Sequence, residues 1–414
     1  MKNKMIFTAL SVALVASSFL MPLSGCNSSA NDPTKDIKPN AVSFNINVKD
    51  GNVGAVDFSL WLFQKSLSDN ENAIMSPLSV LFALAMVANG ADGNTLAQIE
   101  SVFGISIAEL NEYLRVYIKS LSSDDASTLS IANSIWIRDD GSISVVKDFL
   151  DTNVEYYDAS IYKALFNDST LKAINDWVSD KTNGMINEIL DSIDPTDVMY
   201  LINAIAFDAR WENIYTSSDV RQGIFTAVSG QKRDVQMMYS EEGVFLEDTN
   251  AAGFIKYYAD RKYAFVALLP KKGLSVNKYL STLTGRGLVN MLNNAQQTAV
   301  GTCMPKFESE YFIGLNDILS DMGMSDAFDG DKANFTKLGR SKYGNLYIGM
   351  VSHKAYIAVD ESGTKAGAAT IIKIIARGAL MPPSKTVYLD RPFVYMIIDC
   401  ETNVPVFIGT VLDL

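Results

Sequence analysis

The sequence predicts a single large α+β domain, and three observations lead to that class. The chain has 414 residues, of which 48% are hydrophobic and 20% charged, a balance that suits a globular fold with a sizeable core. Apolar residues recur at helical spacing early in the chain, whereas apolar runs between turns follow from residue 224 onward. No linker-like stretch divides residues 42–414, so we expect one domain there.

A targeting segment precedes this domain, in residues 1–25. Two lysines come before an apolar run, residues 6–20, that is too short and too rich in serine for a membrane span. The sequence L-S-G-C that ends at Cys26 resembles a bacterial lipobox. This resemblance implies cleavage before Cys26 and lipidation of its thiol, which would hold an exported protein on a membrane of the bacterial cell envelope. The alternative is an ordinary secretory signal peptide with a chance cysteine.

Residues 26–41 are polar and contain two prolines, a composition typical of a flexible tether. The first helix is expected within residues 53–68, where apolar residues follow helical spacing. A second begins after Ser76, because serine suits the N-cap and Pro77 suits the first helical position. Its turns are apolar nearly all round, so we expect it to be buried. Residues 94–103 predict a further helix.

The middle of the chain mixes both kinds of element. Residues 128–138 read as a strand, and an amphipathic helix with an adjoining turn is expected in residues 169–190. Residues 197–208 are apolar almost without interruption, which indicates a strand buried on both faces. From residue 224 onward we expect mostly short strands, among them residues 265–270.

Three further elements are expected toward the C-terminus. Residues 311–322 have helical spacing, residues 346–360 resemble a strand, and residues 391–414 predict two strands around a D-C-E-T-N turn.

The composition excludes several functions. A net charge of −12 argues against nucleic acid as a partner, since phosphate binding needs clustered Lys and Arg. The three cysteines, Cys26, Cys303 and Cys400, form neither a disulfide framework nor a metal motif, although a Cys303–Cys400 bridge stays open. The single histidine, His353, lies in a strand pattern and reads as a buried neutral imidazole, with catalysis as the alternative. No G-x-S-x-G elbow is present, so an esterase is not expected. We expect no cofactor and no metal.

The segment from Glu361 to Met381 differs from the rest. Its first half is small residues and its second half is β-branched, with Arg377 near the end. In a strand, Thr364 and every second residue to Ala376 would share one uncharged face, and the basic residues would fall on the other. The segment could therefore enter a sheet as a central strand. The alternative is an ordinary strand that ends in a turn.

Nine collinear segments resemble the serpin family over nearly all of residues 53–414. They are N-A-I-M-S-P-L-S (72–79), A-M-V-A-N-G-A-D-G-N-T (85–95), I-N-D-W-V-S-D-K-T-N-G-M-I (174–186), L-I-N-A-I-A-F-D-A-R-W (201–211), M-P-K-F (304–307), D-A-F (326–328), H-K-A (353–355), E-S-G-T-K-A-G-A-A-T (361–370) and R-P-F…F-I-G (391–409). The resemblance implies three β-sheets, about nine helices and an exposed reactive-centre loop. Ser362 and Lys365 depart from the acidic residues usual in the family's loop hinge.

The resemblance also implies site residues. The loop hinge comprises Glu361, Gly363, Thr364, Ala366, Ala368, Ala369 and Thr370. A "shutter" hydrogen-bond cluster beneath the opening sheet comprises Ser76, Ser79, Asn203 and His353. A "breach", where the loop enters the sheet, comprises the ion pair of Lys306 with Glu361 beside Trp211. The family spacing from Gly363 places the scissile bond at Arg377–Gly378. Because this loop carries two extra residues before its prolines, Lys373 and Leu380 are alternative cleavage positions.

The implied activity is suicide inhibition: a protease cleaves the loop, becomes acylated by it and is displaced when the loop inserts as a strand. An Arg at the cleavage site suits a trypsin-like protease, whose pocket has a carboxylate at its base. We therefore expect a monomeric inhibitor, not an enzyme, with Arg-specific serine proteases and Arg-specific cysteine proteases as candidate targets. The alternative is a non-inhibitory serpin that serves as a binding or structural protein and is cleaved only as a substrate.

Overall fold

The computed structural model describes residues 49–121, 127–364, 383 and 385–414. The expected signal peptide, the tether and Cys26 lie outside these residues. The described helices are α1 Lys49–Lys65, α2 Pro77–Ala88, α3 Gly93–Phe103, α4 Ile107–Ser120, α5 Lys147–Tyr157, α6 Asp168–Lys181, α7 Val276–Leu280, α8 Gly285–Asn293 and α9 Asn316–Leu319.

The described strands are β1 Ala73–Met75, β2 Ser127–Arg138, β3 Ile143–Val145, β4 Ser160–Ala164, β5 Met199–Arg210, β6 Val220–Thr226, β7 Lys232–Glu247, β8 Ala251–Tyr257, β9 Tyr263–Pro270, β10 Gln296–Pro305, β11 Phe307–Gly314, β12 Gly339–Ser341, β13 Ser352–Val359, β14 Gly363–Thr364, β15 Lys385–Tyr388, β16 Phe393–Asp399 and β17 Pro405–Val411. The predicted α+β class is confirmed, as are three sheets and nine α-helices within the described residues.

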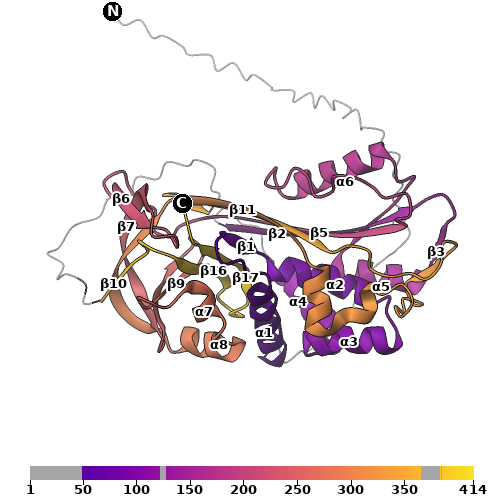
Figure 1. The fold of residues 1–414 in the computed structure, drawn as a ribbon, viewed down its shortest axis with the longest axis horizontal. Coiled ribbons are helices and arrows are strands. Elements are labelled where there is room, and N and C mark those ends of the chain that lie inside the picture. Colours follow the sequence, from indigo (N-terminus) through magenta and orange to yellow (C-terminus); the bar gives the residue numbers. More distant parts are fainter. Residues whose placement is uncertain (1–48, 122–126, 365–382, 384) are drawn as a thin grey trace, which may run out of the picture.

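A six-stranded sheet crosses the middle of the molecule in the order β11-β13-β14-β5-β2-β4. Helices α2 to α5 lie on one side of it and α6 on the other (Figure 1). Its central strand β5 sends Ile205 and Phe207 into the main core and Ile202 and Ala204 into the smaller core under α6. The expected burial on both faces is thus confirmed for the middle of β5, because helices cover both faces there.

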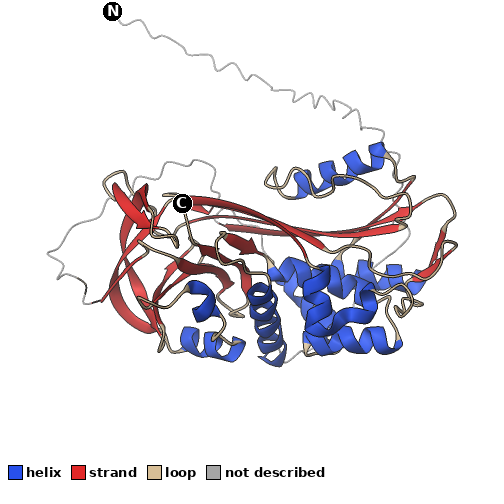
Figure 2. Cartoon of the chain, in the orientation of Figure 1, coloured by secondary structure: helices blue, strands red, loops and turns tan. Residues whose placement is uncertain are grey.

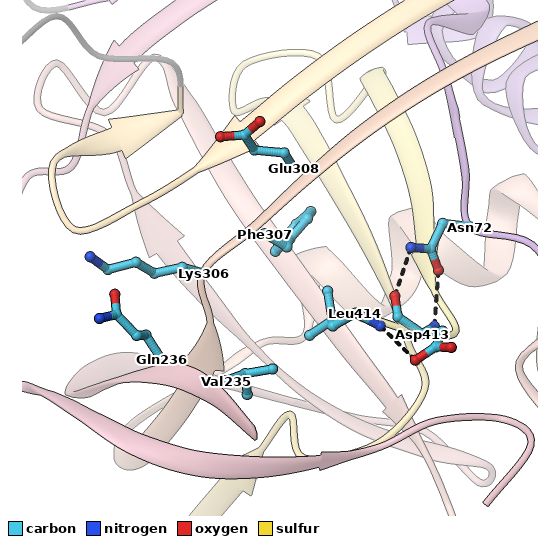
Figure 3. Close-up of a pocket in the computed structure, with 8 residues that line it drawn as sticks. All are labelled: Asn72, Val235, Gln236, Lys306, Phe307, Glu308, Asp413 and Leu414. Carbon is cyan, nitrogen blue, oxygen red and sulfur yellow. Dashed lines mark hydrogen bonds between the residues drawn. The ribbon is translucent and has the colours of Figure 1, made fainter. Parts of the chain in front are cut away.

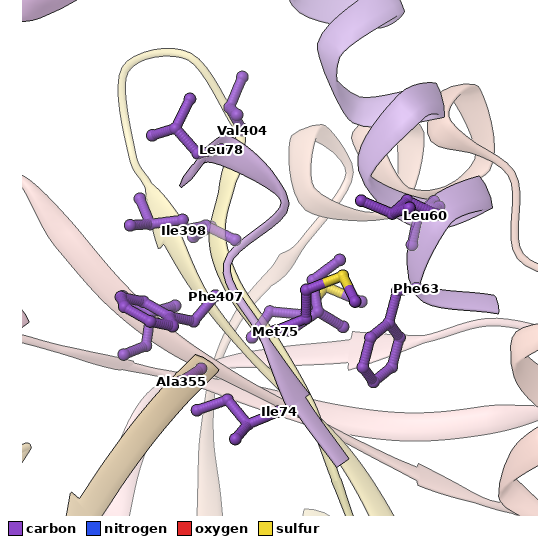
Figure 4. Close-up of a cluster of buried hydrophobic side chains, with 14 of the residues drawn as sticks. Leu60, Phe63, Ile74, Met75, Leu78, Ala355, Ile398, Val404 and Phe407 are labelled. Atoms are coloured by element: carbon purple, nitrogen blue, oxygen red, sulfur yellow. The ribbon is translucent and has the colours of Figure 1, made fainter. Parts of the chain in front are cut away.

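A nine-stranded sheet lies toward one end of the long axis of the molecule, and α7 and α8 lie against it (Figure 2). Its main path runs β1-β17-β16-β9-β8-β7-β10-β15, and β6 pairs with β7. The third sheet is the pair β12-β3. Where the two large sheets approach each other, side chains from α1, β1, β16 and β17 pack into one core, including Phe63, Met75, Ile398 and Phe407 (Figure 4).

Helix α2 forms as the sequence predicts. Ser76 is its N-cap and its hydroxyl oxygen accepts from the Ser79 backbone N–H at 3.2 Å, while Pro77 opens the first turn. Ten of its twelve residues are buried, so the helix is a core element. No helix in the described part of the chain combines the length and the apolar character needed to cross a membrane.

Two expected elements are wrong in part. Residues 311–314 belong to strand β11, and only Asn316–Leu319 and the π-turn Ser320–Met324 after it are helical. The strand expected from residue 346 starts at Ser352, since residues 346–351 form a loop whose backbone bonds to Ala327 and Asn316. The strands after residue 224 are mostly short, as expected, although β7 has 16 residues.

Candidate functional site

The two-residue strand β14 is the centre of the candidate site. Thr364 pairs with Val359 of β13 on one side and with Ala209 of β5 on the other, and both ladders are antiparallel. Among the described residues no ladder joins β5 directly to β13, so β14 alone connects the two halves of the six-stranded sheet by backbone pairing. Gly363 and Thr364, two of the expected hinge residues, are therefore already part of the sheet.

A tight turn delivers the chain from β13 into β14. The Asp360 carboxylate accepts hydrogen bonds from the backbone N–H of Ser362 at 2.7 Å and of Gly363 at 3.2 Å, and the Asp360 N–H donates to Gly363 O at 3.0 Å. A side chain on residue 363 would begin 2.0 Å from Ala209 O, a distance that no real Cβ atom adopts. Glycine is therefore required for β14 to lie this close to β5.

The segment after β5, residues 211–215, holds the same turn from the other side. The Trp211 indole N–H donates to Asp360 O at 2.8 Å, and the Trp211 backbone N–H donates to Ser362 O at 2.9 Å. The Tyr215 backbone N–H donates to Glu361 O at 3.0 Å. Three consecutive carbonyl groups of the turn are thus bound by this one segment, which fixes the end of β13 relative to the end of β5.

The ion pair implied for the breach is present. Lys306 Nζ lies 2.5 Å from Glu361 Oε2, and the hydrogen bond from Lys306 lowers the pKa of Glu361. Both side chains are partly exposed, so water screens the pair. A pocket of about 580 Å³ opens beside Lys306, with Phe307 and Leu414 among its lining residues (Figure 3).

Thr364 faces the interior under the breach. Its side chain is 2% exposed, and its hydroxyl oxygen lies 2.6 Å from the Tyr258 hydroxyl oxygen. The Tyr258 ring stacks on Trp211 with 4.6 Å between ring centroids, and burial raises the pKa of Tyr258, so its hydroxyl stays protonated. The bonded partner of Thr364 is thus a neutral hydroxyl, which suits a small polar side chain better than a charged one.

The four expected shutter residues lie together beneath the sheet. His353 Nε2 accepts from the Ser76 backbone N–H at 3.0 Å, and the Ser79 hydroxyl donates to Asn203 Oδ1 at 2.5 Å. The Asn203 amide in turn donates to Asn133 Oδ1 at 2.8 Å. Burial lowers the pKa of His353 to about 4, so the imidazole is neutral and acts as an acceptor. His353 is thus buried and hydrogen-bonded, as the interpretation of a buried neutral histidine requires.

Sequence reasoning missed four residues of this region. Asn133 of β2 extends the shutter, and nothing in its strand distinguishes it, because β2 carries several other polar residues. Lys256 and Glu242 of the nine-stranded sheet and Tyr258, which directly follows β8, support the breach. No pattern in the sequence around them distinguishes them from surface residues.

Outside the described residues lie the hinge positions Ala366, Ala368, Ala369 and Thr370, the bond Arg377–Gly378, the alternatives Lys373 and Leu380, and the lipidation site Cys26. Cys303 and Cys400 are both free, so they are not bridged to each other. No group of three His, Cys, Asp or Glu side chains within the described ranges is arranged to hold a metal ion.

A central sheet that takes up Gly363 and Thr364 as a short strand, with a polar cluster beneath it, is the arrangement implied by the serpin resemblance. The model of the serpin (serine protease inhibitor) family matches residues 54–414. The chain belongs to the serpin family, whose members are generally protease inhibitors and not enzymes.

Relatives and solved structures agree. Human antithrombin-III is 30% identical over 365 residues, which cover 84% of this chain and 78% of antithrombin. An uncharacterized serpin-like protein of Thermococcus kodakarensis is 29% identical over 364 residues, or 86% of this chain and 84% of that protein. The crystal structure of the thermophilic serpin tengpin in its native state is 51% identical, with a TM-score of 0.88, and covers 93% of this chain and 100% of that one.

Proposed function

We propose that this serpin is a covalent, loop-inserting inhibitor of trypsin-like, Arg-specific serine proteases, with Arg-specific cysteine proteases as a second class of target. The single observation that supports this most is β14: the reactive loop already begins as an antiparallel strand between β13 and β5. The family membership supports the general activity, and Arg377 in the loop supports the specificity.

The register of β14 defines where an inserted loop would lie. Thr364 pairs with Val359 of β13 and with Ala209 of β5, and both ladders are antiparallel. An advance of six residues along the loop therefore corresponds to six residues back along each neighbouring strand. Residue 370 would then lie between His353 and Asn203. Thr370 would face the same side as Thr364, because the separation is even. The shutter cluster would therefore receive the hydroxyl of Thr370.

Insertion of the loop would stabilise the molecule strongly. In the same register, residue 374 would pair with Met199, the first residue of β5, so residues 365–374 would extend β14. Their ladder hydrogen bonds contribute about 0.5–1.5 kcal/mol each. Burial of Ile372 and Ile374 adds about 1.5–3 kcal/mol each. The total is on the order of 10 kcal/mol, comparable with the stability of a whole domain. Arg377 would lie three residues beyond β5, outside the sheet.

Cleavage at Arg377–Gly378 by a serine protease would leave the protease attached through an ester between its serine oxygen and the Arg377 carbonyl carbon. The new amino terminus at Gly378 leaves with the C-terminal fragment. If insertion precedes hydrolysis of this ester, the protease is carried with Arg377 to the far end of the sheet and remains trapped. If hydrolysis is faster, the serpin is merely a substrate.

Trypsin and a soluble form that lacks residues 1–26 provide the test. A denaturing gel would show a covalent complex of summed mass, and N-terminal sequencing would show a fragment that starts at Gly378. The variant Arg377→Ala should form no complex with trypsin, whereas Lys373→Ala should behave like the wild type. Cleavage without a complex would overturn the proposal in favour of a non-inhibitory serpin, and cleavage elsewhere would overturn the assigned bond.

We further propose that acyl chains on Cys26 hold the protein on the bacterial cell envelope. The L-S-G-C sequence supports this, and residues 27–48 could span at most about 80 Å between the lipid and α1. In a bacterial host that processes lipoproteins, the full chain should partition into the detergent phase and carry a mass increase at Cys26. Cys26→Ser should abolish both, whereas Cys400→Ser should not. An unmodified Cys26 would overturn the proposal.

A further inference from the structure

A buried ion pair supports the breach from below. Lys256 in β8 is fully buried and Glu242 in β7 is 7% exposed, and Lys256 Nζ lies 2.8 Å from Glu242 Oε1. Burial alone would lower the pKa of Lys256, but its interactions with Tyr215 and Glu242 outweigh burial and raise the pKa, so the ammonium group stays charged. Neither residue belongs to the shutter or breach residues that the sequence suggested.

The ammonium group contacts the segment 211–215 at three points. Nζ lies 4.4 Å from the centre of the Tyr215 ring and 5.4 Å from that of the Trp211 ring, and it donates to Asn213 O at 3.1 Å. Cation–π contacts are strongest when the cation is desolvated, as it is here. Lys256 thus fastens this segment to the nine-stranded sheet.

The same segment binds the turn that leads into β14. Trp211 and Tyr215 hold the carbonyl groups of residues 360, 361 and 362, as described above. Extension of β14 requires β5 and β13 to accept a new strand between them along their length. The distance between β5 and β13 must then be about two strand spacings of 4.8 Å each. A segment that is fixed to the end of β5 and bonded to the end of β13 resists such a movement.

We propose that the Lys256–Glu242 pair is a positioning element that holds residues 211–215 in place and thereby sets the rate at which the reactive loop inserts. This inference rests on the proposed function, since it assumes that the loop inserts. It assigns the pair a kinetic role in addition to its contribution to folding.

The alternative is that the pair serves stability alone, and a double substitution separates the two roles. Removal of one partner leaves a buried charge and can prevent folding, whereas replacement of both by apolar residues of similar size is often neutral. We therefore choose Lys256→Met with Glu242→Leu. The matched control is Arg115→Met with Glu112→Leu in α4, where Arg115 is 5% exposed and lies 2.7 Å from Glu112.

The measurement is the rate at which uncleaved protein converts to the loop-inserted form at elevated temperature, followed by loss of trypsin inhibition and gain of resistance to denaturant. The Lys256/Glu242 variant should convert about 30-fold faster than the wild type, the factor that a desolvated cation–π contact contributes. The Arg115/Glu112 variant should convert at the wild-type rate. The unfolding free energy of each variant is measured in parallel.

Equal conversion rates in the wild type and the Lys256/Glu242 variant would overturn the inference. It would also be overturned if, in both double variants, the conversion rate rose in proportion to the loss of unfolding free energy. A different result tests the proposed function separately. If wild-type protein gains no thermal stability after cleavage of its loop, the loop does not insert, and the proposed function fails whatever the variants do.

Discussion

The hydroxyl groups of Thr364 and Tyr258 are hydrogen-bonded to each other in the interior, at the point where the loop enters the sheet. Thr364 is 2% exposed and belongs to the face of β14 that looks toward the core. Tyr258 in turn stacks on Trp211, which holds the preceding turn. The first inserted side chain is thus fitted to its place before any protease has acted.

Thr364→Arg should convert the protein from an inhibitor into a substrate. Because Thr364 is already buried beside a neutral hydroxyl, a guanidinium group in its place costs several kcal/mol, which would detach β14 from the sheet and oppose insertion of the loop. With trypsin, the stable complex should disappear while cleavage at Arg377 continues. Thr364→Ser keeps the hydroxyl and should retain the complex. Undiminished complex formation by the Arg variant would contradict the assigned hinge.

Glu361→Lys should loosen the breach. The substitution replaces the attraction to Lys306 by repulsion, so the rate of polymer formation on heating should rise roughly threefold to tenfold, as expected for a partly exposed pair. Light scattering and native gels measure the rate. Glu310→Lys makes the same charge change on the same sheet, where Glu310 pairs with Lys354 at 2.9 Å, and it should leave the rate unchanged. Equal rates for the two variants would argue against a special role for Glu361.

His353 should make the stability depend on pH between about 6.5 and 4. The pKa of the folded protein is about 4, below the ordinary value of 6.5, so in this window the unfolded chain binds a proton that the folded chain does not. The free energy of unfolding should therefore fall as the pH falls from 6.5 to 4, by on the order of 3 kcal/mol from this group.

The chain has one histidine, so His353→Asn isolates this effect. Denaturant unfolding of both proteins at several pH values gives the two slopes, and the variant should have the smaller one. Identical slopes would mean that His353 titrates normally and is not held neutral by burial.

Thr370→Asp and Thr370→Ser should differ although both place a small polar side chain at the shutter. In the register set by β14, Thr370 would point toward His353 and Asn203. The Asp variant should abolish the complex with trypsin and the gain in thermal stability after cleavage, because its carboxylate would be buried beside a neutral imidazole. The Ser variant keeps the hydroxyl and should preserve both. Undiminished complex formation by the Asp variant would contradict this register.

The sequence predicted best where local and long-range signals agree. Helix α2 carries its own start signal at Ser76-Pro77, and its apolar turns match a buried position. The strand expected over residues 128–138 is present as β2 for the same reason, since its composition and its burial agree. Helix α4 received no prediction, although Ser106 and Glu109 form a capping box that marks its beginning.

Long-range contacts decided where local patterns failed. Residues 311–314 have helical spacing, but they are the second half of strand β11. This strand is extended because it pairs with β13 along its whole length. The shutter could be predicted through the family resemblance, since its residues stand in recognisable segments. Lys256 could not be, because a lysine in a strand gives no sign that an acid on the neighbouring strand and two aromatic rings will surround it.

The short length of β14 has a consequence for the fidelity of insertion. A new strand in a sheet needs a nucleus, and the first pairs formed could settle one residue out of step, which would turn every inward side chain outward. Here Gly363 and Thr364 are bonded on both edges beforehand, and only glycine fits at residue 363. The strand would therefore grow from a nucleus whose pairing register is already fixed. An error in alignment would first require these two residues to detach.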